Sequence, residues 1–320
     1  MTTKLPKREP LALLPTPIIL ATNLSKRLGF KLLIKDESFT GFAIGGNKIR
    51  SLEFLLGDHE NWDTLILCGG PTSNFIRAAA VGALHLGKKV ICSFYGSQPT
   101  SVTGNFLILK LMQIECHFSG SEDRATSESK AEQMKEIESS RGDRVKVLPR
   151  GGALPEAVCG FYLMQEEINL QLGSTLIDHL IVPIGTGTMI AGLWLNKETL
   201  RNVSQIWGFC SSRPKDEITK ISRELALEAS VRFGLPGSLK DRLTIRDDTL
   251  GAGYGKVNSD VLDVVRQYAQ AEGIFLDPVF NGKSALGLRN LVNEGKVQPG
   301  QCVLLINGGG LPEIFSGDFN

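Results

Sequence analysis

Short apolar runs alternate with helical patterns along almost the whole chain, and this alternation limits the folds that the chain can adopt. The runs at 63–70 ("DTLILCGG") and 178–187 ("DHLIVPIGTG") each contain an unbroken apolar stretch, at 65–68 and at 180–184, as expected of strands that are buried on both faces. Such strands between helices predict an α/β fold with parallel, doubly wound sheets. Several runs end in glycine turns, and ligands bind at the carboxyl ends of the strands in sheets of this kind.

Periodicity also places the remaining elements. We expect further strands at 31–37, 88–96, 114–120, 144–152, 204–212, 273–280 and 301–310. We expect helices at 48–56, 73–86, 104–112, 125–141 and 154–172, and one that begins near Thr188. Residues 215–249 have the least regular pattern, which predicts a mobile cover.

Length, charge and cysteine usage exclude several classes of protein. The 320 residues, 42% hydrophobic and 22% charged, allow two domains, and the net charge of +1 favours neither nucleic acid nor an anionic membrane as a partner. The polar first ten residues, and the lack of an apolar stretch of about 20 residues, predict a cytoplasmic protein without signal peptide or membrane span. The six scattered cysteines predict reduced thiols, and the four histidines lack ligand spacing, so no metal is expected.

The glycine turn in "IVPIGTGTMIAGL" (181–193) is the strongest sign of an anion site. A buried strand ends at Gly185 and a helix begins near Thr188, so backbone N–H groups and the hydroxyls of both threonines converge. This arrangement suits one phosphate group. The segment lacks the residue order of a Walker loop, and no acidic residue ends the next strand as in a dinucleotide site. A tight strand–helix turn without a ligand is the alternative.

A second turn and a lysine complete the pattern. In "CGGPTSNFIRAAA" (68–80), Ser73 and Asn74 stand where a helix begins, either as a plain N-cap or as donors to a small polar ligand. Lys48 follows residues 45–47 ("GGN"), either as a surface lysine or as an amine that a ligand approaches closely. Together the three features are what a pyridoxal phosphate enzyme needs, because its lysine must form an imine with the cofactor aldehyde.

Seven motifs make a family resemblance specific. In chain order they are "LPTPI" (14–18), "IKDESFTGFAIGGNKIRSLEFLL" (34–56), "CGGPTSNFIRAAA" (68–80), "GTGTMIAGL" (185–193), "GAGYG" (251–255), "GIFLDPVFNGKSALGL" (273–288) and "GGGLPEIF" (308–315). The chain resembles the D-cysteine desulfhydrase / 1-aminocyclopropane-1-carboxylate deaminase family of fold-type II pyridoxal phosphate enzymes. The resemblance implies a large domain (1–49 and 156–320), a small domain (50–155), pyridoxal 5'-phosphate in the cleft between them, and a homodimer.

The resemblance also gives roles to individual residues. Lys48 matches the Schiff-base lysine, with Asn47 beside it in the cofactor site. Ser73 matches the serine over the cofactor plane, Asn74 the asparagine that hydrogen-bonds the ring hydroxyl, and Tyr254 the first of two active-site tyrosines. The backbone of 73–75 would hold the substrate carboxylate. The cofactor phosphate would lie at Gly185, Thr186, Gly187 and Thr188.

The chain departs from the family pattern at five positions. The second tyrosine is Phe280, and the glutamate that faces the pyridine nitrogen in the deaminases is Asn281. The polar residue after the "SN" pair is Phe75, the second lysine is Ser51, and the hydroxyl-bearing residue of the last glycine turn is Gly308. The ring-opening deaminase is therefore disfavoured, because it uses both the tyrosine and the glutamate.

These residues predict a pyridoxal phosphate lyase that acts on a small amino acid by β-elimination. Lys48 would remove the Cα proton, the ring would be the electron sink, and a leaving group on Cβ would depart. Phe75 and Phe280 predict a substrate larger or less polar than cysteine. The alternatives are a β-replacement synthase, a cofactor-binding homologue with weakened catalysis, and an unrelated nucleotide-binding α/β protein.

Overall fold

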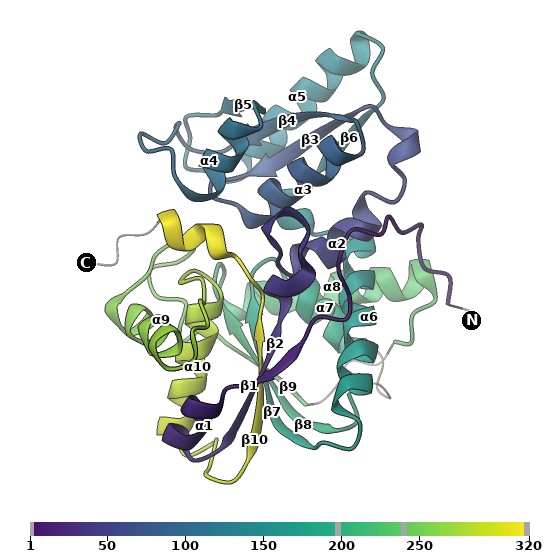
Figure 1. The fold of residues 1–320 in the computed structure, drawn as a ribbon. Helices are drawn as coiled ribbons and strands as arrows, with labels where there is room; N and C mark the ends of the chain where they lie inside the picture. Colours follow the sequence, from purple (N-terminus) through teal and green to yellow (C-terminus); the bar gives the residue numbers. More distant parts are fainter. Residues whose placement is uncertain (1–2, 196–199, 238–241, 317–320) are drawn as a thin grey trace.

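The computed structural model describes residues 3–195, 200–237 and 242–316, which form two α/β units (Figure 1). The larger unit is built on a six-stranded sheet in the order β1-β2-β10-β7-β8-β9, in which only the pair β1–β2 is antiparallel. Its strands are β1 (Ile18–Leu20), β2 (Lys31–Asp36), β7 (Ile177–Ile184), β8 (Val203–Cys210), β9 (Leu243–Arg246) and β10 (Cys302–Asn307). The register places Val303 of β10 beside Leu32 of β2 and His179 of β7.

Two apolar layers cover the large sheet because its central strands are buried on both faces. One layer packs α6 (Pro155–Leu172), α7 (Thr188–Trp194) and α8 (Lys215–Phe233) on the sheet, and the other packs α1 (Thr22–Leu28), α9 (Ser259–Glu272) and α10 (Asn281–Asn293). This is the doubly wound arrangement that near-continuous apolar strands predict.

The smaller unit has a four-stranded, all-parallel sheet in the order β5-β4-β3-β6. Its strands are β3 (Thr64–Gly69), β4 (Lys89–Phe94), β5 (Glu115–Phe118) and β6 (Val145–Leu148), and its helices are α3 (Asn74–His85), α4 (Gly104–Leu111) and α5 (Thr126–Ser140). Helix α2 (Lys48–Leu55) contacts α3 of this unit and α6 of the larger one. Short 3-10 turns are η1 (Glu37–Thr40), η2 (Phe42–Ile44), η3 (His59–Asn61), η4 (Arg150–Gly152) and η5 (Leu311–Ser316). The domain limits at 49/50 and 155/156 stay a prediction.

Two of the expected elements are wrong. Residues 273–280 form no strand, because the Asp277 carboxylate accepts N–H groups from Val279 and Phe280 and folds the segment into the turn that precedes α10. The stretch 215–249 is not irregular: it holds α8 and β9, and only its residues 238–241 lie outside the described part. Helix α8 buries Ile218, Leu225, Ala229 and Phe233 at helical spacing, against the large sheet's core.

The other expected strands and helices are confirmed, with ends that shift by a few residues. No described helix combines the length and the apolar character that crossing a membrane requires. All six cysteines are free thiols.

Candidate active site

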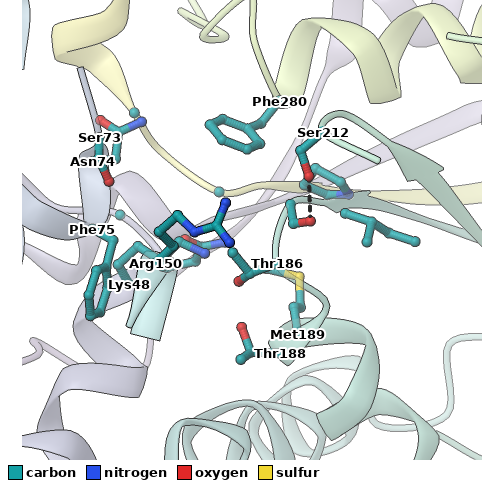
Figure 2. Close-up of a pocket in the computed structure, with 18 of the residues that line it drawn as sticks. Lys48, Ser73, Asn74, Phe75, Arg150, Thr186, Thr188, Met189, Ser212 and Phe280 are labelled. Carbon is teal, nitrogen blue, oxygen red and sulfur yellow. Dashed lines mark hydrogen bonds between the residues drawn. The ribbon is translucent and has the colours of Figure 1, made fainter. Parts of the chain in front are cut away.

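Turns that follow strands of both sheets line one pocket (Figure 2). The pocket includes Gly69 and Gly70 after β3, Gly151 after β6, the 185–188 turn after β7, Ser212 after β8 and 308–310 after β10. Parallel strands bring their carboxyl ends to the same edge of a sheet, so the glycine turns that are far apart in the sequence meet here. The structure thus brings all twelve predicted site residues to this pocket or its walls: Asn47, Lys48, Ser73, Asn74, Phe75, Gly185, Thr186, Gly187, Thr188, Tyr254, Phe280 and Asn281.

Lys48 is the first residue of α2, and the glycines before it permit a chain path that other residues could not follow. Gly45 has φ +69°, and a Cβ on it would lie 1.9 Å from the carbonyl oxygen of Ser38. The next residues anchor the turn, because Gly46 N–H donates to Glu37 O (3.0 Å) and Asn47 N–H donates to Gly308 O (2.9 Å). These two bonds fix the start of α2 between η1 and the last glycine turn.

The amine of Lys48 is less basic than that of an ordinary lysine. Burial lowers the pKa of Lys48 to about 8. Among the described residues, its Nζ has no hydrogen-bond or ion-pair partner. A free amine with a lowered pKa is the form of lysine that attacks an aldehyde or accepts a proton.

Ser73 and Asn74 are both an N-cap and part of the pocket wall. Ser73 Oγ accepts the N–H of Ile76 (3.3 Å), so the residue caps α3 as the sequence allows. Asn74 Oδ1 accepts from Asn105 Nδ2 (2.9 Å), and Asn105 is itself held by Arg77 Nε (2.7 Å). Because its oxygen is engaged, Asn74 presents its N–H₂ as the free donor.

The side chain of Phe75 does not shape the centre of the pocket. It is 1% exposed and packs with Leu55 in the core of the small unit, and a Cβ on Gly152 would lie 2.4 Å from its ring. Figure 2 shows the ring directed away from Phe280 and Thr186. Only the backbone of residue 75 is therefore left for the predicted substrate contact.

The 185–188 turn contains a buried polar atom whose hydrogen-bonding capacity is unused. Thr186 Oγ1 is buried and has no hydrogen-bond partner among the described residues, and such atoms in native structures call for a ligand or water. Gly187 has φ +92°, and a Cβ on it would lie 2.5 Å from Ser222 Oγ. Ser212 Oγ donates to Gly185 O (2.8 Å), which links the turn to the segment that follows β8.

Asn281 uses its whole amide group to join two turns. Its Oδ1 accepts the N–H of Gly308 (2.8 Å), and its Nδ2 donates to Gly309 O (2.6 Å) and to Asp277 Oδ2 (2.5 Å). Both amide hydrogens are therefore committed, and only a lone pair on Oδ1 is left for a ligand. Burial raises the pKa of Asp277 to about 6, although several N–H groups favour its ionised form.

Tyr254 and Phe280 form an aromatic wall, with ring centroids 5.8 Å apart. The guanidinium of Arg124 lies over the Tyr254 ring at 5.1 Å, a cation–π contact. Burial raises the pKa of the Tyr254 phenol, so the phenol is protonated at neutral pH.

Sequence reasoning missed two arginines. Arg124 precedes α5, and Arg150 follows β6; both line the pocket, and Figure 2 shows Arg150 reaching into the space between Lys48, Thr186 and Phe280. The signal for Arg150 was present, because "RGG" at 150–152 ends a strand with a glycine turn. Arg124 lies in a polar stretch that carries no such signal.

Comparisons with known proteins agree with this geometry. The family described as "Pyridoxal-phosphate dependent enzyme" matches residues 10–308. The chain belongs to this family. It is 32% identical to the D-cysteine desulfhydrase of Klebsiella pneumoniae over 94% of this chain and 93% of that protein. It is also 32% identical to a Pyrococcus horikoshii protein, provisionally named 1-aminocyclopropane-1-carboxylate deaminase, over 94% of this chain and 90% of the other.

A solved structure supports the same placement within the pyridoxal-phosphate dependent enzymes. The crystal structure of an ACC deaminase homologue aligns with a TM-score of 0.88 and 31% identity, covering 98% of this chain and 94% of that one. The predicted family, fold-type II architecture and cofactor are thus confirmed.

The pocket fits pyridoxal phosphate at both ends of the molecule. The orphaned Thr186 hydroxyl and the turn around it suit the phosphate, while the free amine of Lys48 suits the aldehyde. Gly308, Gly309 and Gly310 line the pocket without side chains, so a flat ring can lie close to their backbone.

Gly187→Val is expected to weaken binding of pyridoxal phosphate by about 2–4 kcal/mol. A β-branched residue is strained at φ +92°, its Cβ would meet Ser222, and the shifted turn would lose charge-assisted hydrogen bonds to the phosphate. Fluorescence titration of the cofactor-free protein measures the affinity. Gly273→Val is the matched control, because Gly273 has φ +66° but a Cβ there meets nothing within 4 Å. Equal affinity in wild type and Gly187→Val would remove this turn from the site.

Proposed function

We propose that this protein is a lyase that removes the Cα proton of a small amino acid and eliminates the substituent on its Cβ. The observation that carries the proposal is the free, weakly basic amine of Lys48 in the pocket that contains the Ser73 turn and the 185–188 turn. When bound, pyridoxal phosphate supplies the electron sink that makes the Cα–H acidic.

The residues of the chain then divide the remaining work. The N–H groups of the turn at 73–75 hold the substrate carboxylate, and the N–H₂ of Asn74 donates to the ring hydroxyl of the cofactor. Lys48 accepts the Cα proton, because a pKa near 8 leaves a usable fraction of neutral amine at neutral pH. We place the hydroxyl groups of Ser73 and Tyr254 beside the reacting atoms, where they can transfer a proton or donate a hydrogen bond to the substrate.

The part of the pocket wall formed by Phe280 and Asn281 favours elimination over opening of a cyclopropane ring. Phe280 can neither donate nor accept a proton, and the Asn281 amide is engaged with Asp277, Gly308 and Gly309. An amide does not hold a protonated pyridine as a carboxylate does, so the electron sink is weaker than one that a carboxylate supports. We therefore expect little activity on 1-aminocyclopropane-1-carboxylate. The homodimer implied by the resemblance is part of the proposal.

Phe280→Tyr is expected to raise kcat/KM on D-cysteine by about tenfold or more, because a phenol at this position restores a proton donor beside the substrate. The native reaction should fall, since a phenol without a partner in an apolar setting costs about 1–3 kcal/mol. The measurement is kcat/KM of both proteins on D-cysteine, L-cysteine, D-serine and 1-aminocyclopropane-1-carboxylate, with product analysis to separate elimination from replacement.

Phe275→Tyr is the matched control, because Phe275 lies on the same segment but is 58% exposed. Its kinetics should match those of wild type. Efficient wild-type turnover of D-cysteine or aminocyclopropane carboxylate, at about 10⁴ M⁻¹s⁻¹ or above, would show that the role given to Phe280 is wrong.

A further inference from the structure

The pocket has more positive charge than the proposed reaction uses. Its charged lining residues are Lys48, Arg77, Arg124, Arg150, Arg213 and Asp277. The single carboxylate, Asp277, is taken up by N–H groups of residues 279–281 and by the Asn281 amide. It therefore offsets little of this charge in the open part of the pocket.

Two of the arginines are used elsewhere. Arg77 is 1% exposed and directed under the Gly45 turn, where Nε donates to Asn105 Oδ1 (2.7 Å). Arg213, two residues before α8, is paired with Glu217 in the first turn of that helix. Arg77 Nη1 has no hydrogen-bond partner among the described residues, but only 1% of Arg77 is exposed, so neither arginine is expected to meet a ligand in the centre of the pocket.

Arg124 and Arg150 are the two that remain. Arg124 lies over Tyr254, and no ion pair with a described carboxylate holds it. Arg150 Nε donates to Glu128 Oε1 (2.6 Å), so its two Nη groups stay free, and Figure 2 shows the guanidinium pointing into the pocket. Burial raises the pKa of the Tyr95 phenol. The charges of both arginines lower this pKa, and those of Glu122 and Glu313 raise it, so all four charges lie near the same side chain.

The anions of the proposed reaction do not account for these two arginines. The cofactor phosphate has the 185–188 turn with its orphaned Thr186 hydroxyl, and the substrate α-carboxylate has the turn at 73–75. Of the two, only Arg150 has an ion pair, with the half-exposed carboxylate of Glu128. Free guanidinium N–H groups in a cleft are suited to an oxyanion, which they bind through paired, charge-assisted hydrogen bonds.

We propose, resting on the lyase function above, that the substrate carries an oxyanion as its β-substituent, and that Arg124 and Arg150 bind it. Phosphate or sulfate esters of serine are the chemical class. Lys48 takes the Cα proton, the Cβ–O bond breaks, and its electron pair leaves with the phosphate or sulfate oxygen. Water then yields pyruvate and ammonia, so that one amino acid and one water give pyruvate, ammonia and the free oxyanion. The arginines stabilise the charge that develops on the leaving group.

The test compares O-phosphoserine with O-acetylserine, each as both enantiomers, because the two differ in the charge of the leaving group. Wild type, Arg124→Gln, Arg150→Gln and the control Arg27→Gln are measured; Arg27 is an exposed residue of α1. Wild type should favour O-phosphoserine in kcat/KM. Each pocket variant should lose about 10- to 100-fold on O-phosphoserine, the effect of one charge-assisted hydrogen bond, and the loss on O-acetylserine should be clearly smaller.

Two binding measurements separate the possible failures. The first is the Kd of each amino acid, read from the visible band of the holoenzyme: tight, arginine-dependent binding of O-phosphoserine without turnover would support this inference and contradict the lyase. The second is the affinity for pyridoxal phosphate against pyridoxal. If Arg150→Gln weakens only the phosphorylated cofactor, Arg150 serves the cofactor phosphate and the inference is wrong. Equal preference for both substrates in wild type would also overturn it.

Discussion

Lys48→Ala is expected to lower kcat on any substrate by about 10³- to 10⁴-fold and to prevent borohydride from fixing the cofactor to the chain. The variant loses both the amine that bonds the cofactor and the proton acceptor at the substrate Cα, and acid–base groups alone contribute about 10²–10⁴-fold. The visible absorption of the holoprotein should disappear with the same substitution. Absorbance, kcat and peptide mapping after reduction measure the three effects.

Lys283 provides a matched control for this prediction. Burial lowers its pKa to about 8 as well, but its Nζ donates to Leu250 O (2.8 Å) and Gly253 O (2.9 Å), whereas Lys48 has no such partners among the described residues. Lys283→Gln should therefore leave the cofactor attached at Lys48. Reduction of the wild-type protein that labels Lys283, or any lysine other than Lys48, would refute the assignment.

The parts of this fold that the sequence predicts are those that depend on local pattern. Buried parallel strands are apolar throughout, and their ends are marked by glycines with backbone angles that other residues avoid, as at Gly45 and Gly187. Both signals can be recognised in the sequence without knowledge of tertiary contacts. That is why the 185–188 turn and the lysine at the start of α2 are visible in the printed sequence.

The two wrong expectations arise from features that average composition hides. The run at 273–280 has the composition of a strand, but the single carboxylate of Asp277 collects the N–H groups that a neighbouring strand would need. Helix α8 is rich in charged residues on its exposed face, which masks the apolar positions at 218, 225, 229 and 233. In both cases a few specific contacts outweigh average composition.

The pocket's polarity could not be predicted because it depends on which way side chains point. Phe75 contributes its ring to the core, whereas Arg150, two residues after the end of β6, reaches the pocket. The apolar substrate expected from Phe75 and Phe280 thus rests on Phe280 alone. The arginines point to a charged leaving group instead.

A buried charge cluster holds the start of α2 in place. Arg50, whose side chain is 2% exposed, donates from Nη2 to Glu37 Oε1 (3.0 Å) and from Nη1 to Glu167 Oε2 (3.0 Å). Lys35 Nζ donates to the Thr16 carbonyl (2.6 Å) and also to Glu167. The cluster joins the N-terminal segment, β2, α2 and α6, and so fixes the helix on which Lys48 stands.

Arg50→Met is expected to lower the free energy of unfolding by about 3–5 kcal/mol, because it leaves the buried carboxylate of Glu37 and the partly buried one of Glu167 with one remaining cation, Lys35. Burial would raise the pKa of Glu167, but hydrogen bonds and charges of Arg50 and Lys35 lower it to about 2. A folded-state pKa below the ordinary 4.5 stabilises the fold above that pH, and the stabilisation is lost as pH falls from 4.5 toward 2. The difference between wild type and variant should therefore shrink over this range. Denaturant unfolding at several pH values measures it. The control is Arg141→Met, because the Arg141 side chain is exposed and its partner Glu138 keeps its ion pair with Lys89; stability should change by at most about 1 kcal/mol. A loss in Arg50→Met no larger than in Arg141→Met, or one independent of pH, would show that the cluster does not stabilise the fold through its charges.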